Sequence, residues 1–265
     1  MLRNPEPLYA WEDPPAQARA SADLGDQAAQ VAALNARYRH HGATAVLEAA
    51  LRERVAGSIA MVSSFGAESV ALLHLVAMAD RTTPVLFIDT HMLFAETLAY
   101  QQEVAERLRL TDVRVVRASA AALEAEDPYG ALRLSDTDRC CDLRKTRPLN
   151  AALAGFDGWI TGRKRYQSGT RAALEFFELE EATGLIKVNP LAHWSAGDVR
   201  DYMDENRLPR HPLVAQGFPS IGCAPCTSRV APGEDPRAGR WRGQEKVECG
   251  IHIVNGRVVR QGDAT

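Results

Sequence analysis

The sequence predicts an α/β fold with a mostly parallel sheet flanked by helices, followed by a mobile C-terminal tail. Three observations lead to this prediction. Short apolar runs alternate with helical patterns from residue 44 to residue 207, as in successive βαβ units. Hydrophobic residues make up 46% and charged residues 25% of the 265 residues, which is ordinary for a protein with a substantial core. After Cys226 the chain becomes rich in Gly, Pro and charge, as surface segments are.

Helical periodicity or capping residues mark several segments. Residues 44–55 carry apolar side chains on one face and charges on the other, and residues 94–110 predict another helix. Residues 194–207 predict a helix with Ser195 as its N-cap and Asp198 at the N3 position. The apolar face of the first of these helices comprises Val46, Leu47, Ala50, Leu51 and Val55.

Short apolar runs predict the strands. A turn at residues 63–68 follows the first strand, and an apolar helix leads from that turn to about Met78. A helix that starts near Cys141 precedes the last strand of the series. The alternation favours parallel pairing but gives no strand order. The four predicted strands lie within residues 58–63, 83–90, 113–118 and 157–162.

Composition divides the chain into three parts. Residues 1–25 are rich in Pro, Ala and Asp and predict a flexible N-terminal arm. Residues 26–228 form the expected α/β body. Residues 229–265 predict a flexible C-terminal tail, and this tail carries Cys249.

Charge and cysteine content narrow the class of protein. The formal net charge of −3 gives no overall attraction to nucleic acid or to an anionic membrane. No apolar run approaches the ~18 residues that span a bilayer, and the N-terminal segment lacks the apolar stretch of a signal peptide. We therefore expect a cytoplasmic protein with reduced thiols, in which five cysteines indicate metal ligation or catalysis.

The turn SSFGAES, residues 63–69, lies between an apolar strand and a helix. A glycine and hydroxyl side chains at a helix N-terminus offer hydrogen-bond donors to an anion, although a capped turn without a ligand is an equal alternative. The Gly-Lys-Ser/Thr ending of a Walker A loop is absent. Asp89 and Thr90 end the next strand, so we expect them at the same carboxyl edge of the sheet, where open parallel sheets bind ligands.

Four of the five cysteines form two tight pairs, Cys140 with Cys141 and Cys223 with Cys226. Four thiolates suit zinc or an iron–sulfur cluster, and the pattern alone favours the two equally. The adjacent pair is unusual for zinc because neighbouring side chains diverge in most backbone conformations. Four unrelated thiols are the weaker alternative.

Basic residues gather in three groups around these motifs. One such group alone is typical of a solvated surface. Three groups beside the motif turns of a net-negative protein favour a multiply charged anionic ligand. The groups are Arg144, Lys145 and Arg147; Arg163, Lys164, Arg165 and Arg171; and Arg237, Arg240 and Arg242.

The fifth cysteine, Cys249, stands alone in the segment VECGIHIVNG. Lys246 precedes it by three residues, and nearby cations lower the pKa of a thiol and make it a better nucleophile. Cys249 is therefore a candidate nucleophile. An unreactive tail cysteine is one alternative, and a catalytic pair with His252 is a further, weaker one.

These motifs together resemble one family, the thioredoxin-dependent adenylyl-sulfate (APS) and phosphoadenylyl-sulfate (PAPS) reductases of assimilatory sulfate reduction. The resemblance covers about residues 55–252. The two cysteine pairs mark the iron–sulfur branch, which typically uses APS. The family's tail motif reads Glu-Cys-Gly-Leu-His, and Ile251 replaces the Leu here. The motifs concerned are SSFGAES, FIDTHMLFAET, CCDLRKTRPL, WITGRKRYQS, PSIGCAPCT and RAGRWRGQEKVECGIH.

The resemblance implies an adenine-nucleotide α-hydrolase-like fold and a role for each motif. Cys249 would be the nucleophile, and Cys140, Cys141, Cys223 and Cys226 would hold a [4Fe-4S] cluster. Residues 26–228 would bind the nucleotide and the cluster, with Lys145 linking the cluster to the substrate sulfate. Arg237 and Arg240 would bind the sulfate, and Arg171 would contact the substrate. The expected substrate-binding residues are Ser63, Ser64, Phe65, Gly66, Glu68, Ser69, Asp89, Thr90, Lys145, Gly162, Arg163, Arg171, Arg237, Arg240 and His252.

The activity implied is reduction of APS to sulfite and AMP through an enzyme S-sulfocysteine. Reduced thioredoxin, or a glutaredoxin-like protein, would supply the electrons for this step of cysteine biosynthesis. The family forms homo-oligomers, so we expect a homo-oligomer as well. Three alternatives remain at this point, namely reduction of PAPS, a same-fold adenylyltransferase, and a non-enzymatic zinc or redox-sensing module.

Overall fold

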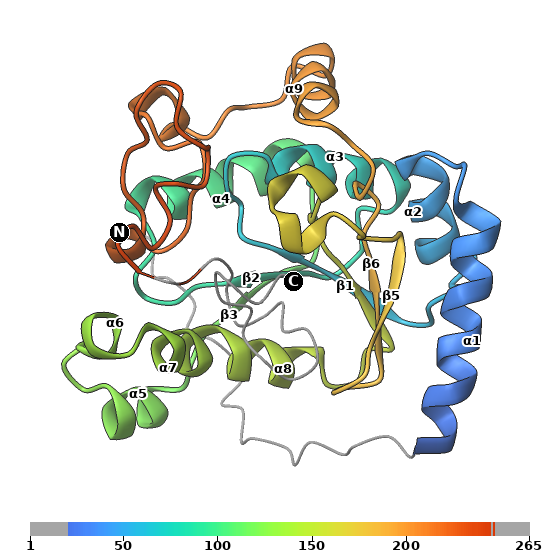
Figure 1. Cartoon of the computed structure of the whole chain (residues 1–265), viewed down its shortest axis with the longest axis horizontal. Helices are drawn as coiled ribbons and strands as arrows, with labels where there is room; N and C mark the ends of the chain where they lie inside the picture. Colours follow the sequence, from blue (N-terminus) through green and yellow to red (C-terminus); the bar gives the residue numbers. More distant parts are fainter. Residues whose placement is uncertain (1–20, 245, 247–265) are drawn as a thin grey trace.

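A six-stranded sheet lies between two layers of helices in the computed structural model, which describes residues 21–244 and 246 (Figure 1). The strand order is β3-β2-β1-β4-β6-β5, and every neighbouring pair is parallel except β5 with β6. This architecture confirms the predicted α/β class. The strands are β1 Ile59–Ser63, β2 Val85–Ile88, β3 Val113–Val116, β4 Gly158–Ile160, β5 Phe177–Glu180 and β6 Leu185–Val188.

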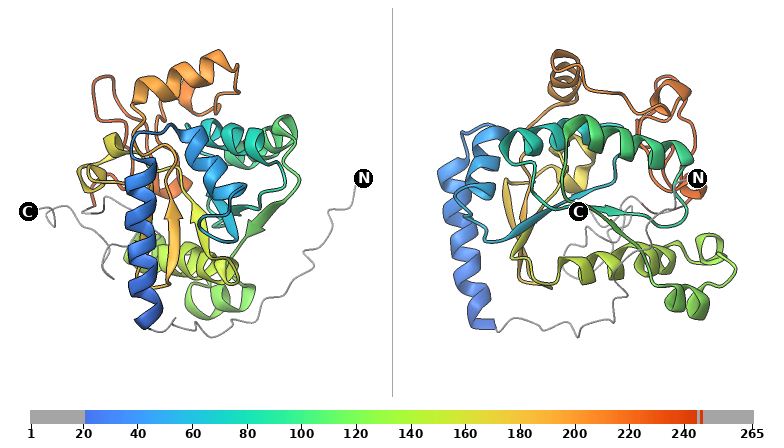
Figure 2. Two further views of the ribbon diagram at one scale, coloured as in Figure 1. Left: turned by 90° about the vertical axis from the view of Figure 1, so that its right-hand side faces the viewer. Right: turned by 180° about the vertical axis from the view of Figure 1, so that it is seen from behind.

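Helices cover both faces of the sheet. Figure 1 shows α2, α3 and α4 above the sheet and α7 and α8 below it, and the two turned views of Figure 2 show the same layers. Helix α1 packs beside the outer strand β5. The α-helices are α1 Ser21–Tyr38, α2 Ala43–Leu51, α3 Ser69–Ala79, α4 Ala95–Leu108, α5 Ala120–Glu126, α6 Leu132–Ser135, α7 Thr137–Cys141, α8 Arg147–Leu153 and α9 Ala196–Glu205.

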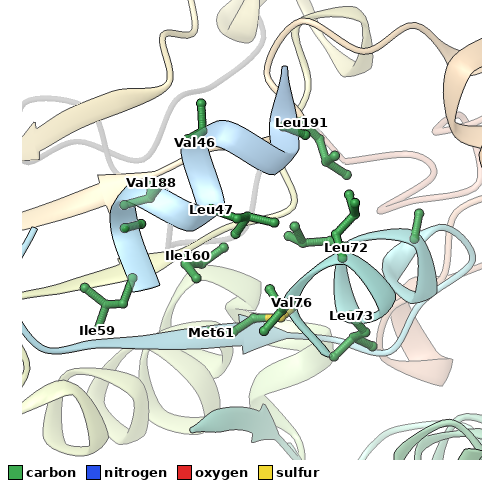
Figure 3. Packing of buried hydrophobic residues seen from close by; sticks show 14 of the residues in the cluster. Val46, Leu47, Ile59, Met61, Leu72, Leu73, Val76, Ile160, Val188 and Leu191 are labelled. Carbon is green, nitrogen blue, oxygen red and sulfur yellow. The ribbon is translucent and has the colours of Figure 1, made fainter. Parts of the chain in front are cut away.

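Successive side chains of a strand point to opposite faces of the sheet, and two hydrophobic cores form, one on each face. On β1, Ile59 and Met61 belong to the larger core under α2 and α3, whereas Ala60 belongs to the smaller core under α8. Figure 3 shows the larger core, where Leu47 and Leu72 approach the strands from two helices. Since both faces are covered, the inner strands β1, β2 and β4 are almost continuously apolar, as the short apolar runs in the sequence indicated.

The predicted helix caps and faces are largely present. The Ser195 hydroxyl accepts a hydrogen bond from the Asp198 N–H at 3.1 Å, and the Asp198 carboxylate accepts one from the Ser195 N–H at 2.7 Å. The Ser195 N–H and the Ser195 hydroxyl both donate to the Asp198 carboxylate and lower its pKa. Helix α2 buries Val46, Leu47 and Ala50 as predicted. Two residues of the predicted face behave differently: Leu51 is the last residue of α2 and only partly buried, and Val55 packs against the core from beyond the helix end.

Three features differ from the sequence predictions. The β5–β6 hairpin was not predicted, because its charged residues alternate with apolar ones in an edge position. Helix α1 begins at Ser21, so residues 21–25 of the expected arm are helical. The chain beyond residue 229 does not leave the body at once, because Trp241 is buried and the Ser228 N–H donates to the Gly239 carbonyl at 2.8 Å.

In the described part of the chain, no helix combines the length and the apolar character needed to cross a bilayer.

Candidate active site

The strand order creates a switch point beside β1. The chain runs from β1 outward to β2 and β3, and then returns to the other side of β1 as β4. Loops that follow β1 and β4 therefore diverge at the carboxyl edge, which is where open α/β sheets bind ligands. A cavity of about 290 Å³ opens there. Its lining includes residues 63, 64 and 66–69 after β1, residues 161–164, 166 and 167 after β4, Lys145, residues 219–222, and residues 235–237 and 240.

Most of the predicted substrate-binding residues meet in this cavity. Three do not line it, namely Phe65, Asp89 and Thr90, and His252 lies outside the described residues, as does the predicted nucleophile Cys249. The predicted residues that line the cavity are Ser63, Ser64, Gly66, Glu68, Ser69, Lys145, Gly162, Arg163, Arg171, Arg237 and Arg240.

The loop after β1 is shaped by its own side chains. Phe65 is fully buried and makes an edge-to-face contact with Phe87, with 5.3 Å between ring centroids. This burial holds its backbone at a φ of 46°, a left-handed conformation that non-glycine residues rarely adopt. The hydroxyl of Ser63 accepts from the Phe65 N–H, and that of Ser69 accepts from the Gly66 N–H. The side chain of Phe65 therefore fixes the loop from the core, and its contact with the substrate stays a prediction.

Asp89 and Thr90 lie at the expected edge of the sheet but have other partners. Asp89 is buried against the Arg117 guanidinium, 2.9 Å away, and accepts a hydrogen bond from the His91 N–H. The Thr90 hydroxyl lies 3.2 Å from the Cys223 sulfur. Asp89 therefore supports the loop after β2 and Thr90 contacts a cysteine, and their contact with the substrate stays a prediction.

The four paired cysteines come together from two segments. Cys140 and Cys141 are buried at the end of α7, and Cys223 and Cys226 flank η5, a 3₁₀ turn over Ala224–Cys226. Burial raises the pKa of Cys140 to about 11, and the proximity of the other three thiols adds to this effect. Burial and the neighbouring thiols also raise the pKa of Cys226. The described residues contain no set of three or more His, Cys, Asp or Glu side chains grouped closely enough for a single metal ion.

A π-helical segment follows the adjacent cysteines directly. Residues Asp142–Thr146 form η1, which joins α7 to α8 in one helical rod from Thr137 to Leu153. Such wide turns in helices are frequent at functional sites. Here the segment buries Arg144 and places Lys145 on the cavity wall. The two consecutive cations therefore lie in different surroundings.

Cations surround the thiols. Arg144 is buried in an ion pair with Asp127, at 2.8 Å, and its charge opposes the rise in the pKa of Cys140. Lys145 and Arg240 act on Cys226 in the same way. The Nε–H groups of Arg144 and Arg240 are buried and find no hydrogen-bond partner among the described residues. Two buried, unsatisfied cationic donors beside four thiols fit an anionic group held by those thiols.

The last described residue also reaches this region. The Lys246 ammonium donates to the Asp138 carboxylate at 2.6 Å and to the Thr137 carbonyl at 3.1 Å. Burial alone would lower the pKa of Lys246, but its interactions with Cys141 and Asp138 raise it. Lys246 therefore connects the C-terminal segment to the start of α7, beside the thiols.

Arg240 is held where the cavity and the thiols meet. It donates from Nη1 to the Ile221 carbonyl at 3.2 Å, and its guanidinium lies 4.5 Å from the centre of the Trp241 ring. Its terminal atoms pack directly over Gly222, where an added Cβ would stand 2.2 Å from one nitrogen. Because Gly222 has no side chain, the Arg240 guanidinium can occupy the space directly beside it, which we call the seat of Arg240.

The cavity residues that the predicted site did not include comprise Lys164, Tyr166 and Gln167 among others. The Lys164 ammonium lies 2.9 Å from the Glu68 carboxylate, and the Tyr166 hydroxyl donates to the same group at 2.8 Å. Gln167 accepts a hydrogen bond from Arg171. Lys164 had been counted within a basic group, but nothing in the sequence pairs it with Glu68 across 96 positions.

The fold and the cavity together define an α/β protein with a cation-rich site for a small anionic ligand at its switch point. Comparison with known proteins specifies the family. The model of the phosphoadenosine phosphosulfate reductase domain matches residues 58–229. The chain therefore belongs to the phosphoadenosine phosphosulfate reductase family.

Three similar proteins illustrate this membership. Adenosine 5'-phosphosulfate reductase of Mesorhizobium japonicum is 48% identical over 253 residues, covering 96% of this chain and 95% of that protein. Phosphoadenosine 5'-phosphosulfate reductase of Gloeobacter violaceus is 41% identical, covering 77% and 88%. The crystal structure of phosphoadenylyl-sulfate reductase from Candida auris, a phosphate complex, has a TM-score of 0.63 and 26% identity, covering 76% and 96%.

Proposed function

We propose that this protein reduces APS to sulfite and AMP, with thioredoxin or a similar dithiol protein as the reductant. The observation that carries the proposal is that the cavity and the thiols share two cations. Lys145 and Arg240 line the cavity, and their charges oppose the rise in the pKa of Cys226. Arg171 and Arg237 line the same cavity. Four cations suit a ligand with both a phosphate and a sulfate group. The name of the 48% identical relative supports the same substrate.

The reaction balances with Cys249 as nucleophile. Its thiolate attacks the sulfur of APS, an S–S bond forms, and the S–O bond to the AMP phosphate breaks with the electron pair leaving on AMP. A thioredoxin thiolate then attacks the Cys249 sulfur and expels sulfite. The second thioredoxin thiol closes its disulfide and restores Cys249, so the dithiol supplies both electrons. Lys145, Arg237 and Arg240 would neutralise the sulfate as the thiolate approaches.

The position of Lys246 supports access of Cys249 to this site. Cys249 follows Lys246 by three positions in the sequence. Lys246 itself is anchored at the start of α7, next to Cys141. The described chain thus reaches the thiols three positions before the proposed nucleophile.

We further propose that Cys140, Cys141, Cys223 and Cys226 hold a [4Fe-4S] cluster. A donor set of four thiols suits it, and the orphaned Nε–H groups of the neighbouring arginines suit its anionic character. When bound, the cluster would join the two cysteine segments and contribute fixed charge beside the cavity. The arginines and lysines of this chain would balance that charge and hold the thiol-bearing segments in place. We also propose that the protein forms a homo-oligomer and is located in the cytoplasm.

Sulfite release with reduced thioredoxin tests the proposal and its substrate. We expect kcat/KM for APS to exceed that for PAPS at least ~10-fold, which corresponds to ~1.4 kcal/mol. PAPS carries an additional 3′-phosphate with about −2 charge near pH 7, which needs donors of its own. Equal or reversed preference would favour the alternative that PAPS is the substrate. Release of no sulfite from either substrate would contradict the function as a whole.

Gly222→Ala tests the seat of Arg240. The new methyl group meets only the far end of a flexible side chain, so we expect the guanidinium to move while the fold persists. APS affinity, measured by calorimetry in the Cys249→Ser background, should fall about 10-fold. Gly42→Ala is the control, because an added Cβ there meets nothing within 4 Å. An unchanged dissociation constant in Gly222→Ala would show that Arg240 does not depend on this seat.

A further inference from the structure

Glu68 is an acidic side chain in a cavity dominated by cations. Within the described residues, Asp235 is the other acid on the wall, and its carboxylate accepts a hydrogen bond from the Arg237 N–H. Glu68 instead gathers donors from the loop after β4, namely Lys164, the Tyr166 hydroxyl and, at 3.5 Å, the Gln167 amide. The cations of the wall are Lys145, Arg163, Lys164, Arg171, Arg237 and Arg240.

In this network Glu68 pairs with the Lys164 ammonium, a cation that would otherwise be available to the ligand. Lys164 is almost completely buried, and its ammonium has the Glu68 carboxylate at 2.9 Å and the Gly162 carbonyl at 3.2 Å. Burial raises the pKa of Glu68 by itself, but the charge of Lys164 and the three hydrogen bonds outweigh it, so the pKa is lowered. The carboxylate therefore stays ionised and keeps Lys164, Tyr166 and Gln167 directed toward itself.

We propose that Glu68 is a specificity-determining residue that excludes sulfonucleotides carrying an additional phosphate. The inference rests on the proposed function and names the group that sets the choice of APS over PAPS. A second phosphate needs two or three donors for its charge. At this part of the cavity wall, Lys164, Tyr166 and Gln167 already donate hydrogen bonds to the Glu68 carboxylate. The charge of this carboxylate also repels an additional phosphate. An adenosine nucleotide without that phosphate makes no such demand.

Glu68→Gln isolates the charge from the shape. Glutamine keeps an oxygen that can accept from Lys164 but carries no charge to oppose a phosphate. We measure dissociation constants for AMP and for adenosine 3′,5′-bisphosphate by calorimetry on the full chain. The wild type should prefer AMP, and the variant should shift the ratio toward the bisphosphate by at least ~10-fold, or ~1.4 kcal/mol.

Glu175→Gln is the matched control. It also removes a carboxylate from an ion pair on the neighbouring segment, with Arg165 at 2.9 Å, but Glu175 does not line the cavity. Its nucleotide preference should equal that of the wild type. A wild type that binds both nucleotides equally, or a Glu68→Gln protein with an unchanged ratio, would overturn the proposal. The same holds if Glu175→Gln shifts the ratio as much as Glu68→Gln.

Lys164→Gln provides a second variant, with the opposite expectation. Without its partner, Glu68 keeps its charge and the bisphosphate should bind even more weakly relative to AMP, by about 10-fold. A shift toward the bisphosphate would contradict the proposed role. Nucleotide binding requires neither Cys249 nor a reductant, so these results stand apart from sulfite release. If sulfite forms but the ratio of the two dissociation constants does not change in Glu68→Gln, this inference fails and the proposed function remains.

Discussion

Cys249→Ser is expected to abolish sulfite release from APS, with a loss of at least ~10⁴-fold in kcat. A serine hydroxyl is far less ionised and less nucleophilic than a thiol near neutral pH, so the first S–S bond cannot form. The substitution is small, and the cations around the cavity do not depend on it. APS should therefore bind the variant with nearly the affinity of the wild type. Coupled sulfite detection measures the loss, and calorimetry measures the binding.

Mass spectrometry supplies the direct control for this result. Wild-type protein mixed with APS in the absence of a reductant should carry one sulfonate adduct, and peptide mapping should place it on Cys249. The Cys249→Ser protein should carry none. An adduct on one of the four paired cysteines would refute the assignment of the nucleophile, as would sulfite release by the serine variant at a substantial fraction of the wild-type rate.

Serine substitutions of Cys141 and Cys226 should remove most of the bound iron. One lies at the end of α7 and the other in the turn η5, so each variant breaks one of the two segments that supply thiols. Iron content should fall by more than half, with loss of the broad visible absorption and of sulfite release. Iron analysis and absorption spectra measure the effect on protein purified without oxygen.

Ser135→Ala is the control for these two variants, because Ser135 is exposed at the end of α6 and does not touch a thiol. Its iron content should match that of the wild type. A full complement of iron in single serine variants of all four paired cysteines would show that these thiols are not the ligands. A colourless protein that contains zinc would return the site to the zinc alternative.

The sheet was predictable where burial on both faces leaves a simple signature. Strands β1 and β2 are short apolar runs that lead directly into polar turns, and both lie within the predicted segments. The β5–β6 hairpin gives a weaker signal. β5 spans four residues in which Glu178 and Glu180 alternate with apolar residues, so its pattern differs from the continuous apolar runs that mark the buried strands. Strand order depends on contacts between distant segments, which no local pattern records.

The site was predictable at the level of motifs but less so at the level of contacts. Local sequence identified the loop after β1 and both cysteine pairs, and the structure brings them to one edge of the sheet. The left-handed backbone of Phe65 follows from its packing on Phe87, which is a tertiary effect. The pairing of Glu68 with Lys164 likewise depends on β1 and β4 being neighbours.

The order of the thiols along the chain has a consequence for biosynthesis. Cys141 is translated 82 positions before Cys223, with β4, β5, β6 and α9 in between. At a translation rate of roughly 5–20 residues per second, the first pair waits about 4–16 s for the second. During this interval the nascent chain offers two adjacent thiols without their partners. A group that needs all four thiols can be delivered only late in translation or after the finished chain leaves the ribosome.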